Sequence, residues 1–590
     1  MSDTQLDMEP GIGPAGRRGA DSRDQEGGLI WKWFTRLLDA KRLTLILVVI
    51  VLGYLALTPL AYLFHGTFFD DGNLTVDSFR RAYEFSGVWE MVYNSLIYSF
   101  GSAILAFLIG TSLAYVTIRT NTRFKSLLVA TALVPLIIPG MLYAISWIML
   151  SSERIGLLNQ ILSAIFGRPL VNLYSLPGMI WVEGTHTAPL VFLFMAAAFR
   201  SMDPSLEESA LVCGASRWQM IRKVTIPLVR PAFSAGILLV AVKAIEGFEI
   251  PALIGLPARI YVFTSRIYFE VSNFDFGAAG ALSINLMLIS VLGVFVLSKT
   301  RGRGREFATV TGKGFRPQTI DLGKAKGPIA VIVLIWFTIT TVLPFVVMLY
   351  VSFLPHYSKF SLEGFRNFSF DNYIELFGNN TFLHSARNSL FLSMGSATII
   401  MTMAAIAAWL VVRGRMRGRG LVDQLTFLPM VVPGLVMGVA LSFVYLRNPL
   451  PFPVYGTIWI LMIAYTTRFL PYGMRYAVPS LTQLSPELEE SAQVSGATWW
   501  QINRKILIPL IIPGLIAGWL YIVITSIREL SSSLLLYSPG NEVLAILIWN
   551  YNDKGELTTV SAIGVVLVLT LVLIVAITYK AGGKIGLKNQ

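Results

Sequence analysis

Charge is scarce in this sequence. Only 14% of its 590 residues are charged, whereas about a quarter are charged in a typical soluble domain. Hydrophobic residues make up 54% of the chain, and its mean hydropathy is +0.64. This combination excludes a soluble globular protein and predicts a polytopic membrane protein.

Soft metal ligands and phosphate-binding loops are also lacking. The chain has one cysteine, Cys213, and four scattered histidines, so no cluster has metal-ligand spacing. A phosphate-binding loop needs G-x-x-x-x-G-K-[ST], and the nearest approach, at 312–314, lacks the leading glycine and the hydroxyl residue. We therefore expect no metal and no cofactor on this chain, and any ATP hydrolysis must occur on another chain.

Long apolar runs are what the sequence does contain. About 20 apolar residues suffice to cross a bilayer. Such windows form two sets of six, at 43–65, 92–117, 127–150, 178–199, 232–255 and 277–299, then at 328–353, 388–412, 421–446, 456–478, 512–536 and 558–579. We expect an all-α integral membrane protein with about 12 transmembrane helices. The first window is too long for a signal-peptide core, so we expect it to be retained.

The segments outside these windows divide the chain further. Residues 1–28 are rich in Gly, Asp and Arg and are predicted to be disordered. Residues 29–42 mix aromatic and basic residues, which favours a helix on the membrane surface, with a frayed start of the first span as the alternative. We expect repeats at 43–300 and 328–580, a basic linker at 301–327 and a tail at 581–590.

Lysine and arginine set the expected orientation. They collect after spans two, six and eight and in the C-terminal tail. Because cytoplasmic loops carry the excess of basic residues, both termini are predicted to be cytoplasmic. Topology thus accounts for the net charge of +13, which requires no nucleic acid as a partner.

One charged segment occurs twice. Residues 204–231 recur at 486–513, at a constant offset of 282 and with 17 of 28 positions identical. Asp203 and Ser485 precede a proline that suits the first position of a helix. Gly214 and Gly496 interrupt these helices, which indicates a bend or a close backbone contact. Two amphipathic loops without a partner are the alternative, but the preserved spacing argues against it.

The repeat extends beyond these segments. Arg119 recurs as Arg413, and "VPLIIPG" at 134–140 recurs as "LPMVVPG" at 428–434, both at an offset of 294. Because the motifs of both halves lie on the same side, the repeats are predicted to be parallel, with an axis along the membrane normal. The prolines within spans three and nine predict helix breaks, which are tolerated only beside protein or a water-filled cavity.

A family resemblance follows from these motifs. Glu208-Ser209-Ala210, Gly214 and Val224-Thr225-Ile226-Pro227 resemble the "EAA, three residues, G, nine residues, I-x-L-P" signature of permease subunits in bacterial binding-protein-dependent ABC importers, and 490–509 repeats it. Serine replaces the first alanine in both copies, and the other departures are aliphatic exchanges. The resemblance implies the type I importer permease fold, in two parallel six-helix repeats in the inner membrane.

Partners and coupling residues follow from the same resemblance. It implies that each segment is a coupling helix in a groove of a cytoplasmic ABC ATPase, that two ATPase copies carry ATP and Mg, and that an extracytoplasmic binding protein delivers the substrate, with lipid around the spans. The residues expected to couple to the ATPases are Glu207, Glu208, Ser209, Ala210, Gly214, Trp218, Pro227, Glu489, Glu490, Ser491, Ala492, Gly496, Trp500 and Pro509.

The substrate is less constrained. Fused double permeases occur in the ferric iron branch of this family, and 245–268 and 528–549 look most like ferric permeases. Ferric iron is therefore the expected substrate, with thiamine, a polyamine or a phosphonate as alternatives. The loops 66–91, 354–387 and 537–557 are expected to contact the binding protein.

Charged residues within the spans suggest a path. Each costs about 2.5–3.5 kcal/mol to insert, so a span that keeps one usually turns it to a cavity or a partner. By offset, Glu246 corresponds to Arg528, and we predict that these two form an ion pair that closes the path. Placement at span ends is the alternative. The predicted path or gate residues are Glu183, His186, Lys243, Glu246, Glu249, Arg468, Arg528 and Glu529.

Two other function classes remain to be weighed. A secondary transporter driven by an ion gradient also commonly has twelve spans, and the charges within the spans would suit it, but it has no use for the repeated cytoplasmic motif. A membrane enzyme would need a nucleophile, a base and an orienting group together, and no span contains these in recognisable spacing. We therefore expect a transport subunit and not an enzyme.

Overall fold

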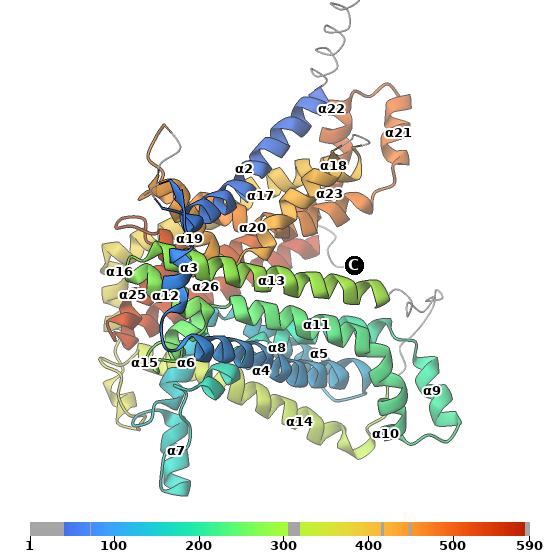
Figure 1. The fold of residues 1–590 in the computed structure, drawn as a ribbon. Coiled ribbons are helices and arrows are strands. Elements are labelled where there is room, and N and C mark those ends of the chain that lie inside the picture. The colour runs from blue at the N-terminus through green and yellow to red at the C-terminus, as the bar shows by residue number, and fades with distance from the viewer. Residues whose placement is uncertain (1–39, 71, 305–318, 415–417, 448–450, 585–590) are drawn as a thin grey trace, which may run out of the picture.

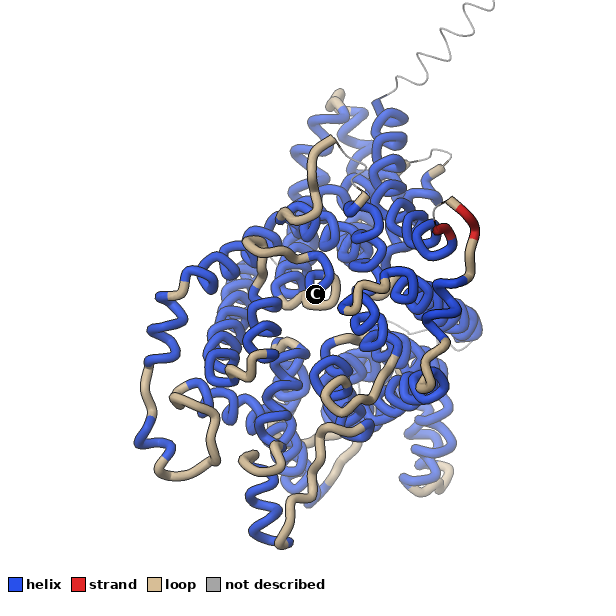
Figure 2. Tube along the Cα trace, turned by 60° about the vertical axis from the view of Figure 1, so that its left-hand side comes forward, coloured by secondary structure: helices blue, strands red, loops and turns tan. Residues whose placement is uncertain are grey.

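The computed structural model describes residues 40–70, 72–304, 319–414, 418–447 and 451–584. The predicted disordered tail and most of the predicted surface helix lie outside these residues. Nearly all of the described chain is helical (Figure 2), and within it the strands Phe69–Asp70 (β1) and Asn73–Leu74 (β2) form one short antiparallel hairpin. The all-α fold is confirmed.

Each predicted span corresponds to a helix or to a pair of helices. Those of the first repeat are α2 (Ala40–Phe68), α4 (Val88–Ala114), α5 (Lys125–Leu133) with α6 (Gly140–Ser151), α8 (Leu176–Ser201), α11 (Ile226–Glu246) and α13 (Phe276–Gly304). Those of the second repeat are α14 (Lys326–Phe337) with α15 (Leu343–Ser352), α17 (Asn380–Val412), α18 (Arg419–Phe427) with α19 (Gly434–Leu446), α20 (Ile458–Thr482), α23 (Ile508–Ile527) and α26 (Leu557–Lys584).

Length and composition support eight to eleven of the twelve predicted crossings. Eight helices are long and apolar enough to cross a membrane, and three more crossings are possible as bent pairs. The twelfth candidate, α20, has 25 residues but carries Arg468 and Arg475, which lower its hydropathy. Arg468 is one of the charged residues predicted to lie within a span, so it is part of the reason why the hydropathy of α20 is low for a membrane span.

Short helices connect the spans at two opposite ends of the bundle (Figure 1). The α9/α21 end, at the right in Figure 1, carries α9 (Pro204–Val212), α10 (Arg217–Met220), α21 (Glu487–Val494) and α22 (Trp499–Ile502). The α12/α25 end, at the left, carries α3 (Asp77–Tyr83), α12 (Phe263–Ser272), α16 (Asp371–Gly378) and α25 (Leu544–Asp553). Two further short helices are α7 (Leu157–Phe166) and α24 (Ser533–Leu536).

The third and ninth spans are sharply broken. The helix axis turns by 99° between α5 and α6 and by 107° between α18 and α19. In both spans a 3₁₀ turn ends in an extended residue, and Pro139 or Pro433 then caps the second helix. A proline cannot donate a backbone hydrogen bond, so it is tolerated where a helix begins. The interruptions predicted at these prolines are confirmed.

The first span of each repeat packs on the other repeat. Helix α2 lies along α19 and α18, and α15 lies along α6 as well as α26. Each of these packings includes a hydrogen bond between the repeats. The hydroxyls of Tyr54 and Tyr445 lie 3.0 Å apart, and the Tyr143 hydroxyl donates to the Thr340 carbonyl at 2.8 Å. The largest hydrophobic core therefore combines residues of both repeats.

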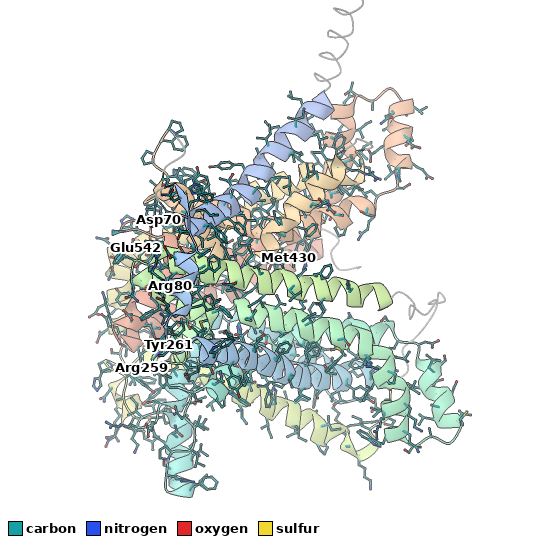
Figure 3. The ribbon with its side chains drawn as sticks, viewed as in Figure 1. Asp70, Arg80, Arg259, Tyr261, Met430 and Glu542 are labelled. Carbon is teal, nitrogen blue, oxygen red and sulfur yellow. The ribbon has the colours of Figure 1, made fainter. Side chains whose placement is uncertain are left out.

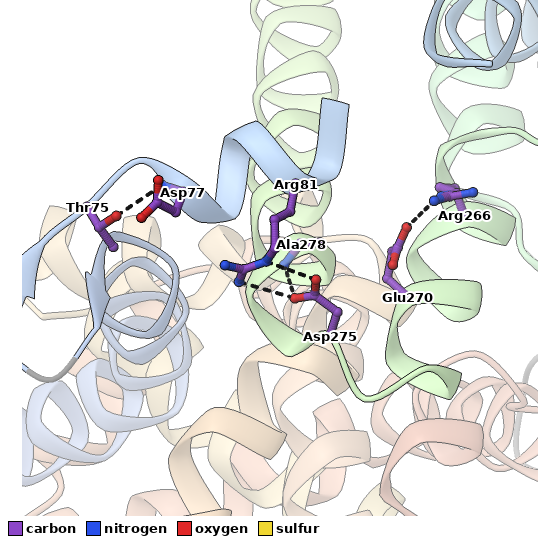
Figure 4. Close-up of polar contacts among 7 residues, drawn as sticks. All are labelled: Thr75, Asp77, Arg81, Arg266, Glu270, Asp275 and Ala278. Carbon is purple, nitrogen blue, oxygen red and sulfur yellow. Dashed lines mark hydrogen bonds and ion pairs between the residues drawn. The ribbon is translucent and has the colours of Figure 1, made fainter. Parts of the chain in front are cut away.

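Ion pairs stiffen the α12/α25 end (Figure 4). Arg81 of α3 binds Asp275 at 3.0 Å, and Asp275 also accepts the backbone N–H of Ala278 at 2.9 Å, so it caps α13. Partial burial alone would raise the pKa of the Asp275 carboxyl, but these two interactions outweigh it and hold the pKa below its usual range. Arg266 pairs with Glu270 within α12.

Candidate functional site

The two copies of the repeated segment occupy equivalent places at the α9/α21 end (Figure 1). Each copy is a helix, a tight turn, a second short helix and a π-helical turn that leads into a span. In the first copy the order is α9, α10, Ile221–Thr225 and α11, and in the second it is α21, α22, Asn503–Leu507 and α23. The duplication in the sequence is thus a duplication in space.

Glycine ends the first helix in both copies because of its backbone conformation. Gly214 has φ +84° and Gly496 has φ +80°, in the left-handed region. The N–H of the next residue, Ala215, reaches back to the Ala210 carbonyl at 3.0 Å, and Ala497 makes the same bond to Ala492. A Cβ at either glycine would meet nothing within 4 Å. Of the two expected explanations the bend is therefore the right one, and no close backbone contact is present.

Reciprocal side-chain bonds start the second short helix. The Ser216 hydroxyl accepts the Gln219 N–H at 3.2 Å, and the Gln219 side chain accepts the Ser216 N–H at 2.8 Å. Thr498 and Gln501 form the same capping box in the second copy. Both glutamine side chains are therefore used within the segment itself.

An ion pair, buried in the first copy and partly buried in the second, fastens each first helix to its own half. Glu207 of α9 is 4% exposed and binds Arg119, which follows the second span, and it also accepts the Thr225 hydroxyl at 2.6 Å. In the second copy Glu489 binds Arg413 at 2.7 Å. These carboxylates therefore hold α9 and α21 in place. The sequence had predicted them only as residues that couple to the ATPases.

The linker between the repeats ends beside the first of these pairs. The Ile320 N–H donates to the Arg119 carbonyl at 2.8 Å, and the Asn121 amide donates to Asp321 at 2.6 Å. Lys326 at the start of α14 binds the same carboxylate at 2.9 Å. Lys326 and Asn121 hold the pKa of Asp321 well below its usual range. The first span of the second repeat is thereby tied to the loop that positions α9.

The remaining predicted coupling residues face outward. Ala210 and Ala492 are half-buried, and the exposed ones are Glu208, Ser209, Gly214, Trp218, Pro227, Glu490, Ser491, Gly496, Trp500 and Pro509. Two residues that were not predicted, Val212 and Val494, are the most exposed large hydrophobic residues of the described chain, at 88% and 90%. In the sequence, the signal that could have identified them is a valine two residues before each glycine. Each tip thus presents an apolar contact surface flanked by carboxylates.

The eight predicted path residues form one electrostatic cluster between the halves. Arg468 binds Glu529, which also accepts the backbone N–H of Ser532 at 2.9 Å. Glu183 accepts the Tyr98 hydroxyl at 3.1 Å. The remaining groups lie close enough to interact through their charges. Lys243 is attracted by Glu183, Glu246 and Glu249 and repelled by Arg528, and Arg528 also acts on His186 and Glu249. Within the described residues no group of three or more His, Cys, Asp or Glu is placed to hold a metal ion.

The predicted ion pair between Glu246 and Arg528 is wrong. Arg528 instead donates to the backbone carbonyl of Leu136 at 2.8 Å. The break in the third span leaves this carbonyl without a helical partner, so a guanidinium from the other half can reach it. The acidic partner in the second half is Glu529, which takes Arg468. Position in the repeat therefore located the cluster but not its pairing.

Glycines let the charged groups approach the two broken spans. A Cβ on Gly140, where α6 begins, would collide with the Glu249 carboxylate, and a Cβ on Gly434, where α19 begins, would collide with the Arg468 guanidinium. The first half thus places a carboxyl group, and the second half a guanidinium, at the equivalent helix start. An anion is favourable at this end of a helix, whereas the cation is held by Glu529.

Comparison with known proteins agrees with the duplicated architecture. The sequence profile for "Binding-protein-dependent transport system inner membrane component" matches residues 91–300 and 400–581. The chain belongs to this family. It is a multi-pass permease subunit of an ABC importer, fused from two copies of the family domain.

Several relatives cover most of the permease. It is 26% identical over 539 residues to the ferric transport system permease protein FbpB of Actinobacillus pleuropneumoniae, covering 90% of this chain and 77% of the relative. It is 27% identical over 485 residues to the Fe(3+)-transport system permease protein FbpB 2 of Haemophilus influenzae, covering 81% and 87%. The spermidine/putrescine permease PotC of Escherichia coli is 28% identical over 40% of this chain and 86% of its own. A bacterial alginate ABC transporter aligns with 49% of this chain and 100% of its own at 20% identity and a TM-score of 0.39.

Proposed function

We propose that this permease imports ferric iron delivered by an extracytoplasmic binding protein. The observation that carries the proposal is the similarity, over 81–90% of this chain, to permeases named for ferric transport. The charged cluster has both signs and no metal-ligand group among the described residues. The proposal therefore assigns recognition of iron to the binding protein and passage to the permease.

ATP hydrolysis in this proposal occurs on two cytoplasmic ATPases. They dock on the tips of α9 and α21, which places the α9/α21 end and both termini in the cytoplasm. Support comes from the two equivalent tips, each with an almost fully exposed valine and an exposed tryptophan, Trp218 or Trp500. Exposed apolar groups of this kind mark protein interaction sites.

The substrate is tested with the whole assembly in proteoliposomes. Vesicles with ATP inside are given the binding protein loaded with ferric iron, and uptake of the metal is measured against vesicles without ATP. Iron uptake that needs both ATP and the binding protein supports the proposal. Uptake of thiamine, a polyamine or a phosphonate without uptake of iron refutes the substrate but leaves the importer intact.

Docking is tested at the native cysteine. Cys213 lies at the tip of α9 and is exposed, and it is the only cysteine of the chain. A maleimide that cannot cross membranes is expected to label it only from the cytoplasmic side, and bound ATPase is expected to block the reaction. Ser495→Cys in a Cys213→Ser background is the matched probe on α21. Labelling from the outside, or labelling that the ATPase does not slow, contradicts the proposed orientation or docking.

A further inference from the structure

A surface depression of about 550 Å³ lies at the α12/α25 end of the second half. Its walls come from the first turns of α17, from the start of α20 and from the loop 539–541. Figure 3 labels Glu542, which follows this loop, at the end of the bundle opposite α21. The depression therefore opens on the side away from the proposed ATPase contacts.

A buried amide in its wall has a donor without a partner. Asn541 is 4% exposed, and its side-chain oxygen accepts the Ser538 N–H at 2.7 Å, which fixes the orientation of the amide. Its Nδ2 is buried and donates to no group in the described structure. A buried donor that stays unpaired costs about 1–3 kcal/mol, so this group calls for an acceptor from outside.

Two further features of the wall favour a negative charge. Arg387 is exposed and forms no ion pair with any described residue. The wall also contains the N-terminus of α20, a helix of 25 residues whose first turn is capped by Thr457. The positive end of a helix dipole stabilises anions. Among the described residues that line the depression there is no aspartate or glutamate, and the neighbouring Glu542 accepts the Gly540 N–H at 2.9 Å.

We propose that this depression binds the carboxylate of an acidic side chain on the extracytoplasmic binding protein. The inference rests on the proposed function, because the depression lies at the end where that function places the binding protein. Arg387 would supply a charge-assisted pair and Asn541 the second donor. The Asn388 amide holds the loop in place through the Glu542 carbonyl at 3.0 Å.

The first half does not repeat the site. Tyr93 stands at the position of Arg387, at the repeat offset of 294. The arginine of the corresponding loop, Arg259, lies apart at the same end of the bundle (Figure 3). The depression is therefore an asymmetric feature of a permease with pseudo-twofold symmetry. In this proposal, the same lobe of the binding protein always contacts the second half.

The test uses the complete transporter in nanodiscs and measures ATP hydrolysis as the concentration of its binding protein is varied. Arg387→Glu is expected to raise the KM for the binding protein at least tenfold while Vmax at saturation is unchanged. Asn541→Asp keeps the acceptor for Ser538 but replaces the donor with a carboxylate, and it is expected to act in the same direction. Tyr93→Glu, the matched change in the first half, is expected to leave KM unchanged.

The outcomes separate this inference from the proposed function. An unchanged KM in Arg387→Glu overturns the inference while transport by the unaltered protein still supports the function. A change that appears only in nanodiscs with anionic lipid, and not in phosphatidylcholine alone, assigns the site to a lipid headgroup and also overturns it. Restoration of KM by a lysine in place of one acidic residue of the binding protein identifies the partner carboxylate.

Discussion

Breaking the buried pair between Arg119 and Glu207 is expected to uncouple ATP hydrolysis from transport. The two side chains are only 2% and 6% exposed, so removal of one partner leaves an uncompensated buried charge. Such a loss costs about 3–5 kcal/mol. Since about 1.4 kcal/mol is tenfold, α9 should detach from its half roughly 10² to 4 × 10³ times more often. Apart from this pair, α9 contacts mainly α10 and the turn after it, so the cost should appear as local release.

The assay is the ratio of ATP hydrolysed to substrate transported, in proteoliposomes. Glu207→Gln and Arg119→Gln are each expected to raise this ratio severalfold at normal membrane insertion. The double change to Leu and Met removes both charges, which is often neutral in buried pairs, so it should recover part of the coupling. The corresponding changes at Arg413 and Glu489 should have a smaller effect, because these side chains are 14% and 17% exposed. Single variants with an unchanged ratio would refute the reasoning.

Three further outcomes follow from other contacts. Gly214→Ala should weaken ATPase binding, because a side chain in the left-handed region costs about 1–2 kcal/mol, whereas Gly214→Asn should retain more of it. Arg468→Gln and Glu529→Gln should show a coupling energy of about 0.5–3 kcal/mol in a double-mutant cycle on transport. Arg81→Ala should lower the free energy of local opening around α3 by about 0.5–1 kcal/mol at pH 7, which is measured as faster proteolysis of this segment. Since the folded pKa of Asp275 is depressed, that contribution is present above about pH 4 and is lost as pH falls through the folded pKa.

Controls for these three predictions are available in the same chain. Equal effects of the Ala and Asn changes would show that backbone conformation is not the reason for the glycine. The cycle on Glu246→Gln and Arg528→Gln should be additive, since these residues are not paired. A large coupling energy there would instead support the ion pair between them that the sequence predicted. A difference between unaltered protein and the Arg81 variant that persists at pH 2 would mean that the carboxylate charge does not carry the contact.

The repeat made a large part of this protein predictable from its residues. The apolar spans, the breaks at Pro139 and Pro433 and the two copies of the charged segment all follow from local signals, because a span needs only a run of apolar residues and a helix start needs only its cap and proline. The eight ionisable residues predicted for the path could be named for a similar reason, since an ionisable group within a span is costly wherever it occurs. What they contact could not be named, and the expected partner of Arg528 was wrong.

The sequence by itself determined that this is a duplicated helical membrane protein in which one charged segment occurs twice, since composition, periodicity and a constant offset are properties of the chain alone. Tertiary structure decided which groups meet. It laid α2 on the second repeat, turned Glu207 and Glu489 inward and left Val212 and Val494 exposed. The physical reason is that a helix start, a broken span or a buried arginine offers bonds to whatever packing brings near, and packing depends on surfaces hundreds of residues apart.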